Sequence, residues 1–205
     1  MQTKYTTLQK FKATLFFIII AVVHSIYSNE VLQVKFPENE NCVAYKTNKS
    51  MIFQDSVDVV GSNCQISISK IKTNGKLMIK VSIPLLSFNS NSKGRDGFVR
   101  KYLKEEINPT IEFTSVELAN EELNDFVNQH DKSRNLVLNG KLTIGNESFP
   151  VRFTLQKKSS GLTGMMVTSF SYFNLKPPVA GPFGSVARVK DYLELHLQVK
   201  YDSLK

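Results

Sequence analysis

Hydrophobic and polar residues alternate along most of this chain. The clearest case is the segment 189–201, where one face carries Val189, Leu193, Leu195, Leu197, Val199 and Tyr201, and the other carries Lys190, Glu194, Gln198 and Lys200. The same repeat of two residues runs through 76–86, 135–144 and 148–156. Such a repeat is typical of strands with one buried face and one face in water, which form antiparallel sheets.

Further segments with strand character bring the expected number of strands to eight or nine. They are 31–36, 51–61, 64–71, 111–118 and 162–173. A sheet of this length must pack on a second sheet or close on itself, because open edges invite aggregation. An eight-stranded barrel leaves room for packed side chains or one slender ligand. The alternation therefore predicts an all-β domain, and it leaves sandwich and barrel both open.

Two short segments break the alternation and are expected to be helices. The first lies within 94–113; its expected features are Asp96 as N-cap, an apolar stripe of Phe98, Val99, Tyr102 and Leu103, and a stop near Asn108 before Pro109. The second covers 120–131, with Leu123, Phe126 and Val127 spaced for one face. We expect one or both to cap an open end of the β structure. The Pro- and Gly-rich segment 175–189 is expected to be an irregular loop.

The N-terminal segment has the layout of a secretory signal peptide. Lys4, Lys10 and Lys12 precede an apolar run at 13–23, and Ser25 or Ser28 offers a small residue before a cut. The run is shorter than the roughly 20 residues that a membrane span needs, although an uncleaved anchor helix is the alternative. We therefore expect residues 1–28 to be removed and residues 29–205 to form one domain.

Composition narrows the possible functions. Cleavage would lower the net charge from +8 to +5, and basic residues do not cluster with aromatic ones as they do in nucleic-acid-binding proteins. Cys42 and Cys64 permit a disulfide in an exported protein, and two free thiols are the alternative. The chain has 14 Phe, 7 Tyr and 5 Met, enough to fill a core and also to line a cavity for an apolar molecule.

Signals for catalysis are weak. Past residue 28 the histidines are His130 and His196, and neither has the spacing of a metal site; His196 is expected to be a solvated surface residue. Nucleophile elbows and phosphate-binding loops are not found in the sequence. Pairs of acidic residues such as Glu105 and Glu106 are expected to be solubilising charges. We expect no enzyme, no metal and no cofactor.

Two longer stretches, 87–115 and 136–155, resemble the YceI-like polyisoprenoid-binding family, whose motifs occur here in the same order and spacing. The matching residues are Arg95, Asp96, Pro109, Ile111, Phe113, Gly140, Leu142, Thr143, Ser148, Pro150, Val151, Val189 and Asp191. The resemblance spans about residues 67–202. It implies an exported protein with a lipocalin-like eight-stranded antiparallel β-barrel that holds a long isoprenoid-type lipid.

The chain departs from the family pattern at three places. Phe98 stands where the family often has His, Asn108 where it has Tyr, and Asn146 at the position of the hairpin Gly. Asn tolerates a positive φ, so the hairpin can form. The missing His means that recognition of a ligand head group does not carry over from the family.

Together these observations predict a lipid-binding barrel. The inward positions expected to contact ligand are Ile79, Val81, Phe113, Leu138, Phe153, Met166, Phe170, Leu195 and Leu197. Arg95, at a helix end, is expected to be structural or else to bind a head group. The expected partner is a long-chain apolar small molecule, with no nucleic acid.

The expected location is the periplasm or the exterior, with membrane contact only transient, as the source of ligand. Monomer and homodimer both stay open. Two alternatives also remain. One is a structural or stress-related envelope module with a filled core, and the other is an envelope enzyme acting on apolar substrates.

Overall fold

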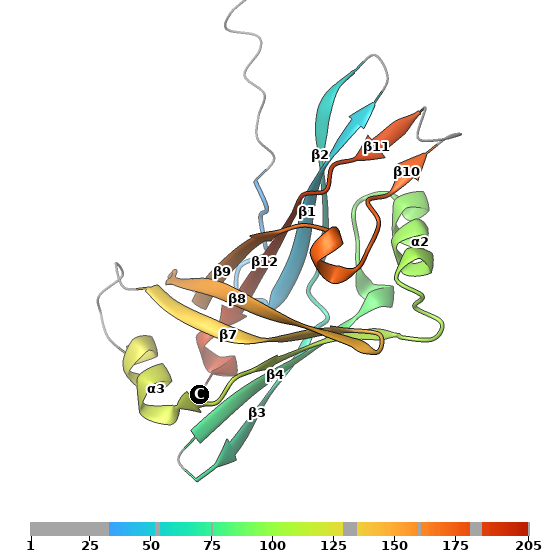
Figure 1. The fold of residues 1–205 in the computed structure, drawn as a ribbon. Helices are drawn as coiled ribbons and strands as arrows, with labels where there is room; N and C mark the ends of the chain where they lie inside the picture. Colours follow the sequence, from blue (N-terminus) through green and yellow to red (C-terminus); the bar gives the residue numbers. More distant parts are fainter. Residues whose placement is uncertain are drawn as a thin grey trace, which may run out of the picture. The chain divides into compact units, whose positions relative to one another are not determined.

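The computed structural model describes residues 33–51, 54–74, 76–128, 135–159, 161–180 and 186–204. These residues form an antiparallel sheet with two α-helices (Figure 1). The strands are β1 (Cys42–Met51), β2 (Gln54–Asn63), β3 (Ser67–Thr73), β4 (Lys76–Pro84), β5 (Thr110–Ser115), β6 (Leu118–Ala119), β7 (Asn135–Ile144), β8 (Glu147–Lys157), β9 (Gly161–Thr168), β10 (Val179–Ala180), β11 (Ala187–Val189) and β12 (Leu193–Lys200). The helices are α2 (Lys93–Tyr102) and α3 (Asn120–Asn128), with 3-10 turns η1 (Leu85–Ser87), η2 (Ser171–Phe173) and η4 (Tyr201–Ser203).

The expected all-β, lipocalin-like fold with short helices is confirmed, with more strands than the eight or nine expected. Neighbouring strands follow the order β10-β11-β1-β12-β9-β8-β7-β5-β4-β3, while β2 pairs with β1 and β6 pairs with β4. The last long strands pair in register as the alternation requires, with Leu195 opposite Met166 and Leu197 opposite Gly164. Among the described strands no continuous ladder closes the sheet between β2 and β3.

A corner between β2 and β3 connects the two ends of the sheet instead. Ser62 of β2 exchanges two backbone hydrogen bonds with Asn89, which follows β4 and η1, at 2.9 and 2.8 Å. The neighbouring Asn63 is 1% exposed, and its amide donates to the carbonyl of Pro84 at 2.7 Å. Cys64 then bonds to Cys42 at the start of β1, so the disulfide that the sequence left open is formed. The sheet therefore curves into a barrel joined at a corner.

The core lies on the concave face of the sheet. Strands β7 and β8 alternate strictly between buried and exposed residues over most of their length, as the sequence predicts. Their buried side chains include Leu138 and Phe153, and the Phe153 ring meets that of Phe113 edge to face with centroids 6.0 Å apart. Burying each such side chain stabilises the fold by roughly 1.5–3 kcal/mol.

The two helices differ from each other and, in part, from expectation. The helix expected at 120–131 is confirmed over 120–128, where Leu123 and Phe126 are 2% and 1% exposed and Val127 is partly buried. Residues 129–131 lie outside the described part. The N-cap of α2 is Ser92, so the assignment of Asp96 as N-cap is wrong, and the helix ends at Tyr102, well before Pro109. Among the described residues, no helix is long and apolar enough to cross a bilayer.

Several expectations about strands also need correction. The strand expected at 162–173 ends at Thr168, and residues 171–173 form η2 instead. Residues 33–36 are not in a strand, and residues 31–32 lie outside the described part. Strand β1, which lies at the centre of one sheet region, was not predicted, because its inward residues include Thr47 and Lys49 and do not look hydrophobic. The segment 175–189 contains β10 and β11 as well as irregular chain, and its residues 181–185 lie outside the described part.

Candidate ligand cavity

The concave face of the sheet encloses a cavity of about 550 Å³. Its walls come from β1, β4, β5, β7, β8, β11 and β12, and they are almost wholly apolar. One end is lined by Leu123 of α3 together with Leu162 and Leu204. The other end is lined by α2 and by Val179 of β10, which lie side by side in Figure 1. A cavity of this size falls in the range that binds small molecules.

Most of the residues predicted to contact ligand line this cavity. Nine of the ten do so: Ile79, Val81, Phe113, Leu138, Phe153, Phe170, Leu195, Leu197 and Arg95. Val81, Leu195 and Leu197 are only partly buried, although they lie on the inner face. Met166 is the exception: it packs against the buried cluster opposite Leu195 but does not line the cavity.

Two glycines make room for aromatic rings in the wall. A Cβ on Gly140 of β7 would lie 2.5 Å from the ring of Phe113, and one on Gly61 of β2 would lie 2.5 Å from the ring of Tyr45. Contacts this short do not occur between real atoms, so any larger residue would displace the ring. The glycines therefore fix where Phe113 and Tyr45 lie in the cavity wall.

Arg95 and Asp96 clamp the start of α2 to the barrel. The Asp96 carboxylate accepts from the Ser90 amide at 2.9 Å and also from its hydroxyl. The Arg95 guanidinium donates to the Ser90 hydroxyl at 2.8 Å and also to the Ser90 carbonyl. This geometry gives Arg95 the structural role that was one of its two expected roles, while its side chain still borders the cavity.

Tyr45 lies beside this clamp, on the inner face of β1. Burial raises the pKa of Tyr45 to about 12; the charge of Asp96 adds to the rise, and that of Arg95 opposes it. Its ring contacts Phe88 with centroids 5.8 Å apart. The phenol is therefore neutral at physiological pH and is the main polar group of the inner wall near α2.

Helix α2 covers its end of the cavity without being buried. Arg95, Phe98, Val99, Tyr102 and Leu103 line the cavity, yet none of the ten residues of α2, all of them described, is buried. The rings of Phe98 and Tyr102 stack with centroids 5.8 Å apart. The Tyr102 hydroxyl donates to the Lys176 carbonyl, which links the helix to the chain leading into β10.

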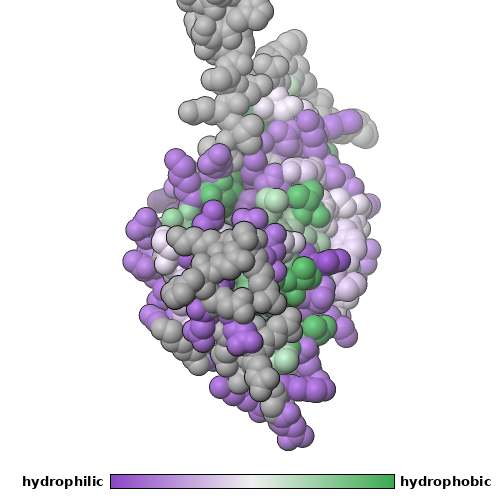
Figure 2. Space-filling view, turned by 90° about the vertical axis from the view of Figure 1, so that its left-hand side faces the viewer, coloured by the Kyte–Doolittle hydropathy of each residue, from purple (hydrophilic) through white to green (hydrophobic). Residues whose placement is uncertain are grey.

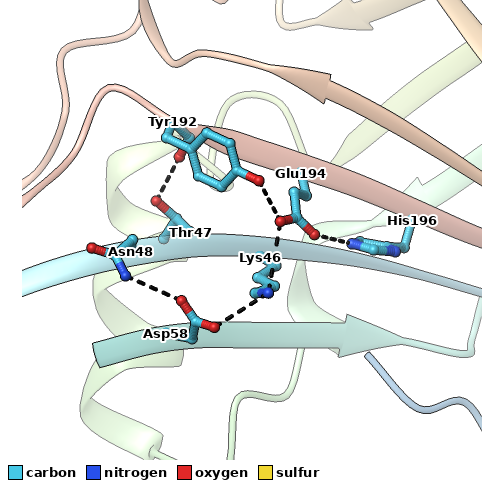
Figure 3. A network of polar contacts seen from close by, with 7 residues as sticks. All are labelled: Lys46, Thr47, Asn48, Asp58, Tyr192, Glu194 and His196. Carbon is cyan, nitrogen blue, oxygen red and sulfur yellow. Dashed lines mark hydrogen bonds and ion pairs between the residues drawn. The ribbon is translucent and has the colours of Figure 1, made fainter. Parts of the chain in front are cut away.

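A polar network lies across β1, β2 and β12 (Figure 3). The Lys46 ammonium is 3.2 Å from Asp58 and 3.6 Å from Glu194, and its side chain is only 8% exposed. Glu194 also accepts from Tyr192 and lies 2.8 Å from the ring nitrogen of His196. The expectation that His196 is a solvated surface residue is therefore wrong: its side chain is 17% exposed and paired.

The network shifts the pKa values of its members. Burial alone would raise the pKa of Glu194, but the hydrogen bonds from Tyr192 and His196 and the charges of Lys46 and His196 together lower it below its usual value. The hydrogen bond to Glu194 is the largest cause that raises the pKa of Tyr192 to about 12. An ionised Glu194 therefore holds the network together at neutral pH.

The described residues offer no set of metal ligands that is free to bind an ion. Their single cluster, Glu40 with Cys42 and Cys64, has both sulfur atoms in the disulfide. His130 lies outside the described residues.

The sequence model of the YceI-like domain matches residues 39–201. The chain belongs to the YceI-like family. The match begins well before residue 67, where the resemblance in sequence starts, so it includes β1, β2 and the disulfide. Among curated proteins, none matches this chain in sequence.

Two solved structures share the YceI-like fold. A polyisoprenoid-binding domain from Saccharophagus degradans, implicated in plant cell wall breakdown, is 12% identical; the match covers 79% of this chain and 97% of that one, with a TM-score of 0.53. BcnA from Burkholderia cenocepacia is 17% identical; the match covers 78% and 96%, with a TM-score of 0.50. At these identities the likeness concerns the fold alone.

Sequence reasoning missed the part of the cavity formed by β1. Val43, Ala44, Tyr45, Thr47 and Lys49 line it, and Val43, Tyr45, Thr47 and Lys49 lie on one face of the strand by its alternation. The alternation with a period of two is present, but it is hard to recognise because Thr47 on the inner face is polar and Lys46 on the outer face is buried. The available signal was the strong β-propensity of Val, Tyr and Thr at alternate positions.

Proposed function

We propose that this YceI-like protein binds and carries a long apolar, isoprenoid-type molecule in its cavity. The observation that carries the proposal is the cavity of about 550 Å³ with an almost wholly apolar wall. The inner-face residues that line it, such as Val81, Phe153 and Leu195, are the ones we assign to contact the ligand. The polyisoprenoid-binding domain that shares the fold supports this class of ligand.

The apolar wall favours a ligand whose binding is driven by removal of its apolar surface from water rather than by hydrogen bonds. Transfer of each CH2 group from water into such a wall stabilises a complex by about 0.8 kcal/mol. Several polar groups of the lining are already engaged within the protein: Arg95 binds Ser90, Tyr102 binds the Lys176 carbonyl, and Thr47 binds the Tyr192 carbonyl. A chain of many carbons can therefore bind tightly with few polar contacts.

We further propose that the protein works outside the cytoplasm as a carrier and not as an enzyme. The lysines and apolar run of residues 1–28 support export to the periplasm or the exterior. The Cys42–Cys64 disulfide fits an oxidising compartment. The apolar wall supports binding rather than catalysis, because acid–base chemistry needs polar groups directed at the substrate.

The alternative of a structural module with a filled core makes a different prediction. A filled barrel has no space for ligand, whereas here Val81, Leu195 and Leu197 are only partly buried around a cavity. We therefore favour the carrier.

The first test asks whether the purified protein carries a bound lipid and whether a larger side chain in the cavity weakens ligand binding. Organic extraction and mass spectrometry should detect a bound apolar molecule, and the stripped protein should bind retinol, a fluorescent isoprenoid alcohol. Val81→Phe places a larger side chain in the cavity and should weaken retinol binding at least several-fold. Met78→Phe is the matched control, because Met78 lies on the same strand but on the opposite face.

Two results would overturn the proposal. One is a protein that yields no lipid and does not bind retinol. The other is equal retinol binding by Val81→Phe and Met78→Phe, because binding would then not depend on the inner face of β4.

A further inference from the structure

We propose that α2 and its neighbours form a docking surface for a bilayer that contains anionic lipids. The surface consists of the apolar residues Phe98, Ile107 and Val179 and the cations Lys93, Arg100, Lys101, Lys104 and Lys176. It lies at the end of the cavity that α2 covers. The inference rests on the proposed function, since a carrier of apolar molecules must meet the membrane that holds them.

The apolar part of the docking surface is exposed where the cavity ends. Phe98 and Val179 both line the cavity, yet they are 47% and 57% exposed. Ile107, in the turn that follows α2, is 75% exposed. Single exposed apolar residues are common, but here two of them border the cavity itself, where water contact is costly and contact with lipid would remove it.

Charge complementarity selects the partner. Four cations lie on α2 or directly after it, and Lys176 adjoins the helix through the Tyr102 hydrogen bond. None of the five has an ion-pair partner among the residues that the structure describes. Of the nearby acids, Asp96 is turned to Ser90, and Glu105 and Glu106 follow the helix. Asp191, whose charge reaches Tyr102, accepts hydrogen bonds from Ser171. A helix with exposed aromatic and basic residues fits the interface of an anionic bilayer.

Between the Ser90 clamp at its start and the Tyr102 hydrogen bond at its end, the helix is loosely packed. It contains Gly94 and Gly97, and a Cβ on Gly94 would meet no atom within 4 Å. On Gly97 it would meet only an Arg100 nitrogen, at 3.9 Å. Packing therefore does not require these glycines, which lower the intrinsic stability of the helix. On a bilayer the C-terminal end of α2 can shift and expose the cavity once the Tyr102 hydrogen bond breaks, while the Ser90 clamp holds the start of the helix.

Apolar residues are also exposed elsewhere on the described surface. Val116, Val167 and Tyr172 lie near Lys141 and Arg152, but none of the three lines the cavity. On the face shown in Figure 2, apolar groups appear as separate spots among hydrophilic ones. Strand β3, on another part of the sheet in Figure 1, carries an exposed apolar residue, Ile71 at 44%, and the cations Lys70 and Lys72. It has no place in the cavity wall, which makes it a matched control.

Flotation with phosphatidylcholine vesicles, with and without phosphatidylglycerol, tests the charge of the surface. The purified protein should bind the anionic vesicles and bind the neutral ones far less. Arg100→Gln combined with Lys101→Gln should weaken this binding by about fivefold for each cation removed. Lys70→Gln combined with Lys72→Gln changes the net charge equally and should leave it unchanged.

A tryptophan reporter tests the contact itself, because the chain contains no Trp. Phe98→Trp should shift its emission to the blue on anionic vesicles and be quenched by brominated lipid. Ile71→Trp, at a site of similar exposure, should show neither change. Failure of the wild type to bind vesicles, or equal responses at positions 98 and 71, would overturn the docking proposal.

Retinol binding in solution separates this proposal from the proposed function. A protein that binds retinol but not vesicles refutes only the docking surface. Equal loss of vesicle binding in the β3 double variant would also refute it, because attraction would then follow net charge alone. A protein that binds vesicles through α2 and retinol through the barrel supports both proposals.

Discussion

The two helices of this protein look alike in sequence and differ in what they do. Both are short and carry an apolar stripe, and one or both were expected to cap an open end of the β structure. Helix α3 buries Leu123 and Phe126 in the core, whereas α2 buries none of its residues. The ring of Phe126 also lies 4.9 Å from the Lys157 ammonium, a cation–π contact with β8.

The difference lies in what each apolar stripe meets. The side chains of α3 join a cluster with Leu77, Leu118 and Leu136, so that end is filled with protein. The stripe of α2 faces the cavity and is anchored by polar contacts at its two ends, to Ser90 and to Lys176. One helix is therefore part of the core, and the other is a cover.

The largest expected effect is on stability at α3. Phe126→Ala removes a ring that is 1% exposed and should lower the free energy of unfolding by about 3–5 kcal/mol. Phe98→Ala removes a ring that is 47% exposed and should cost less than about 1 kcal/mol. Urea unfolding of both variants measures the difference. Similar losses would mean that α2 is as much a part of the core as α3.

The disulfide joins two segments of the β structure and belongs to neither helix. It ties the start of β1 to the corner after β2, 22 residues on. Replacing Cys42 and Cys64 by Ser should lower the free energy of unfolding by about 3 kcal/mol, mainly by freeing the unfolded chain. Urea unfolding of the double variant should match that of the reduced wild type. A loss confined to amide exchange in α2, without a global loss, would contradict this assignment.

The inner wall could be predicted from the sequence where the alternation was apolar. On β4, β5, β7, β8 and β12 the period of two decides which residues face inward, and Ile79, Phe113 and Leu138 line the cavity as predicted. Met166 was predicted by the same rule and does lie on the inner face. It does not line the cavity, although Leu195, its partner across the strands, does, so periodicity alone does not predict which inner-face residues reach the cavity.

What could not be predicted from the sequence depends on which side chains meet in the folded chain. The Asp96 carboxylate accepts hydrogen bonds from Ser90 instead of capping the helix, so the N-cap prediction was wrong. Lys46 pairs with Asp58 and Glu194 on two neighbouring strands, and these carboxylates compensate the charge of the buried ammonium. The corner at Ser62 and Asn89 likewise depends on two residues far apart in the chain.

Low pH should lower the stability of the fold through the polar network on β1, β2 and β12, without involving either helix. The pKa of Glu194 is lowered in the folded state, so its contribution to stability is fully present above its ordinary value of 4.5 and is lost as pH falls through the folded pKa. Urea unfolding between neutral pH and pH values below 4.5 should show a steeper loss for the wild type than for Glu194→Gln.

A control variant separates this effect from general acid denaturation. Glu117→Gln removes an exposed ion pair with Lys76, which contributes little to stability. The free energy of unfolding of this variant should fall with pH as steeply as that of the wild type. Equal slopes for the wild type and Glu194→Gln would show that the network does not stabilise the fold through its charge. Loss of the same slope in Glu117→Gln would point to the overall charge instead.

The smallest effect should be confined to α2 and tests its looseness directly. Gly94→Ala with Gly97→Ala should stabilise the helix by up to about 1 kcal/mol for each site, because a Cβ meets open space there. Hydrogen exchange should slow for amides in residues 93–104, and the free energy of global unfolding in urea should rise by no more than the gain in the helix. Gly140→Ala is the opposite case: its Cβ would lie 2.5 Å from the Phe113 ring, so it should destabilise the whole barrel. If α2 opens to admit ligand, the double alanine variant should also take up retinol more slowly while binding it no more weakly. Amides of α2 that exchange as slowly in the wild type as those of β7 would show that the helix is no loose cover, and the contrast with α3 would then fail.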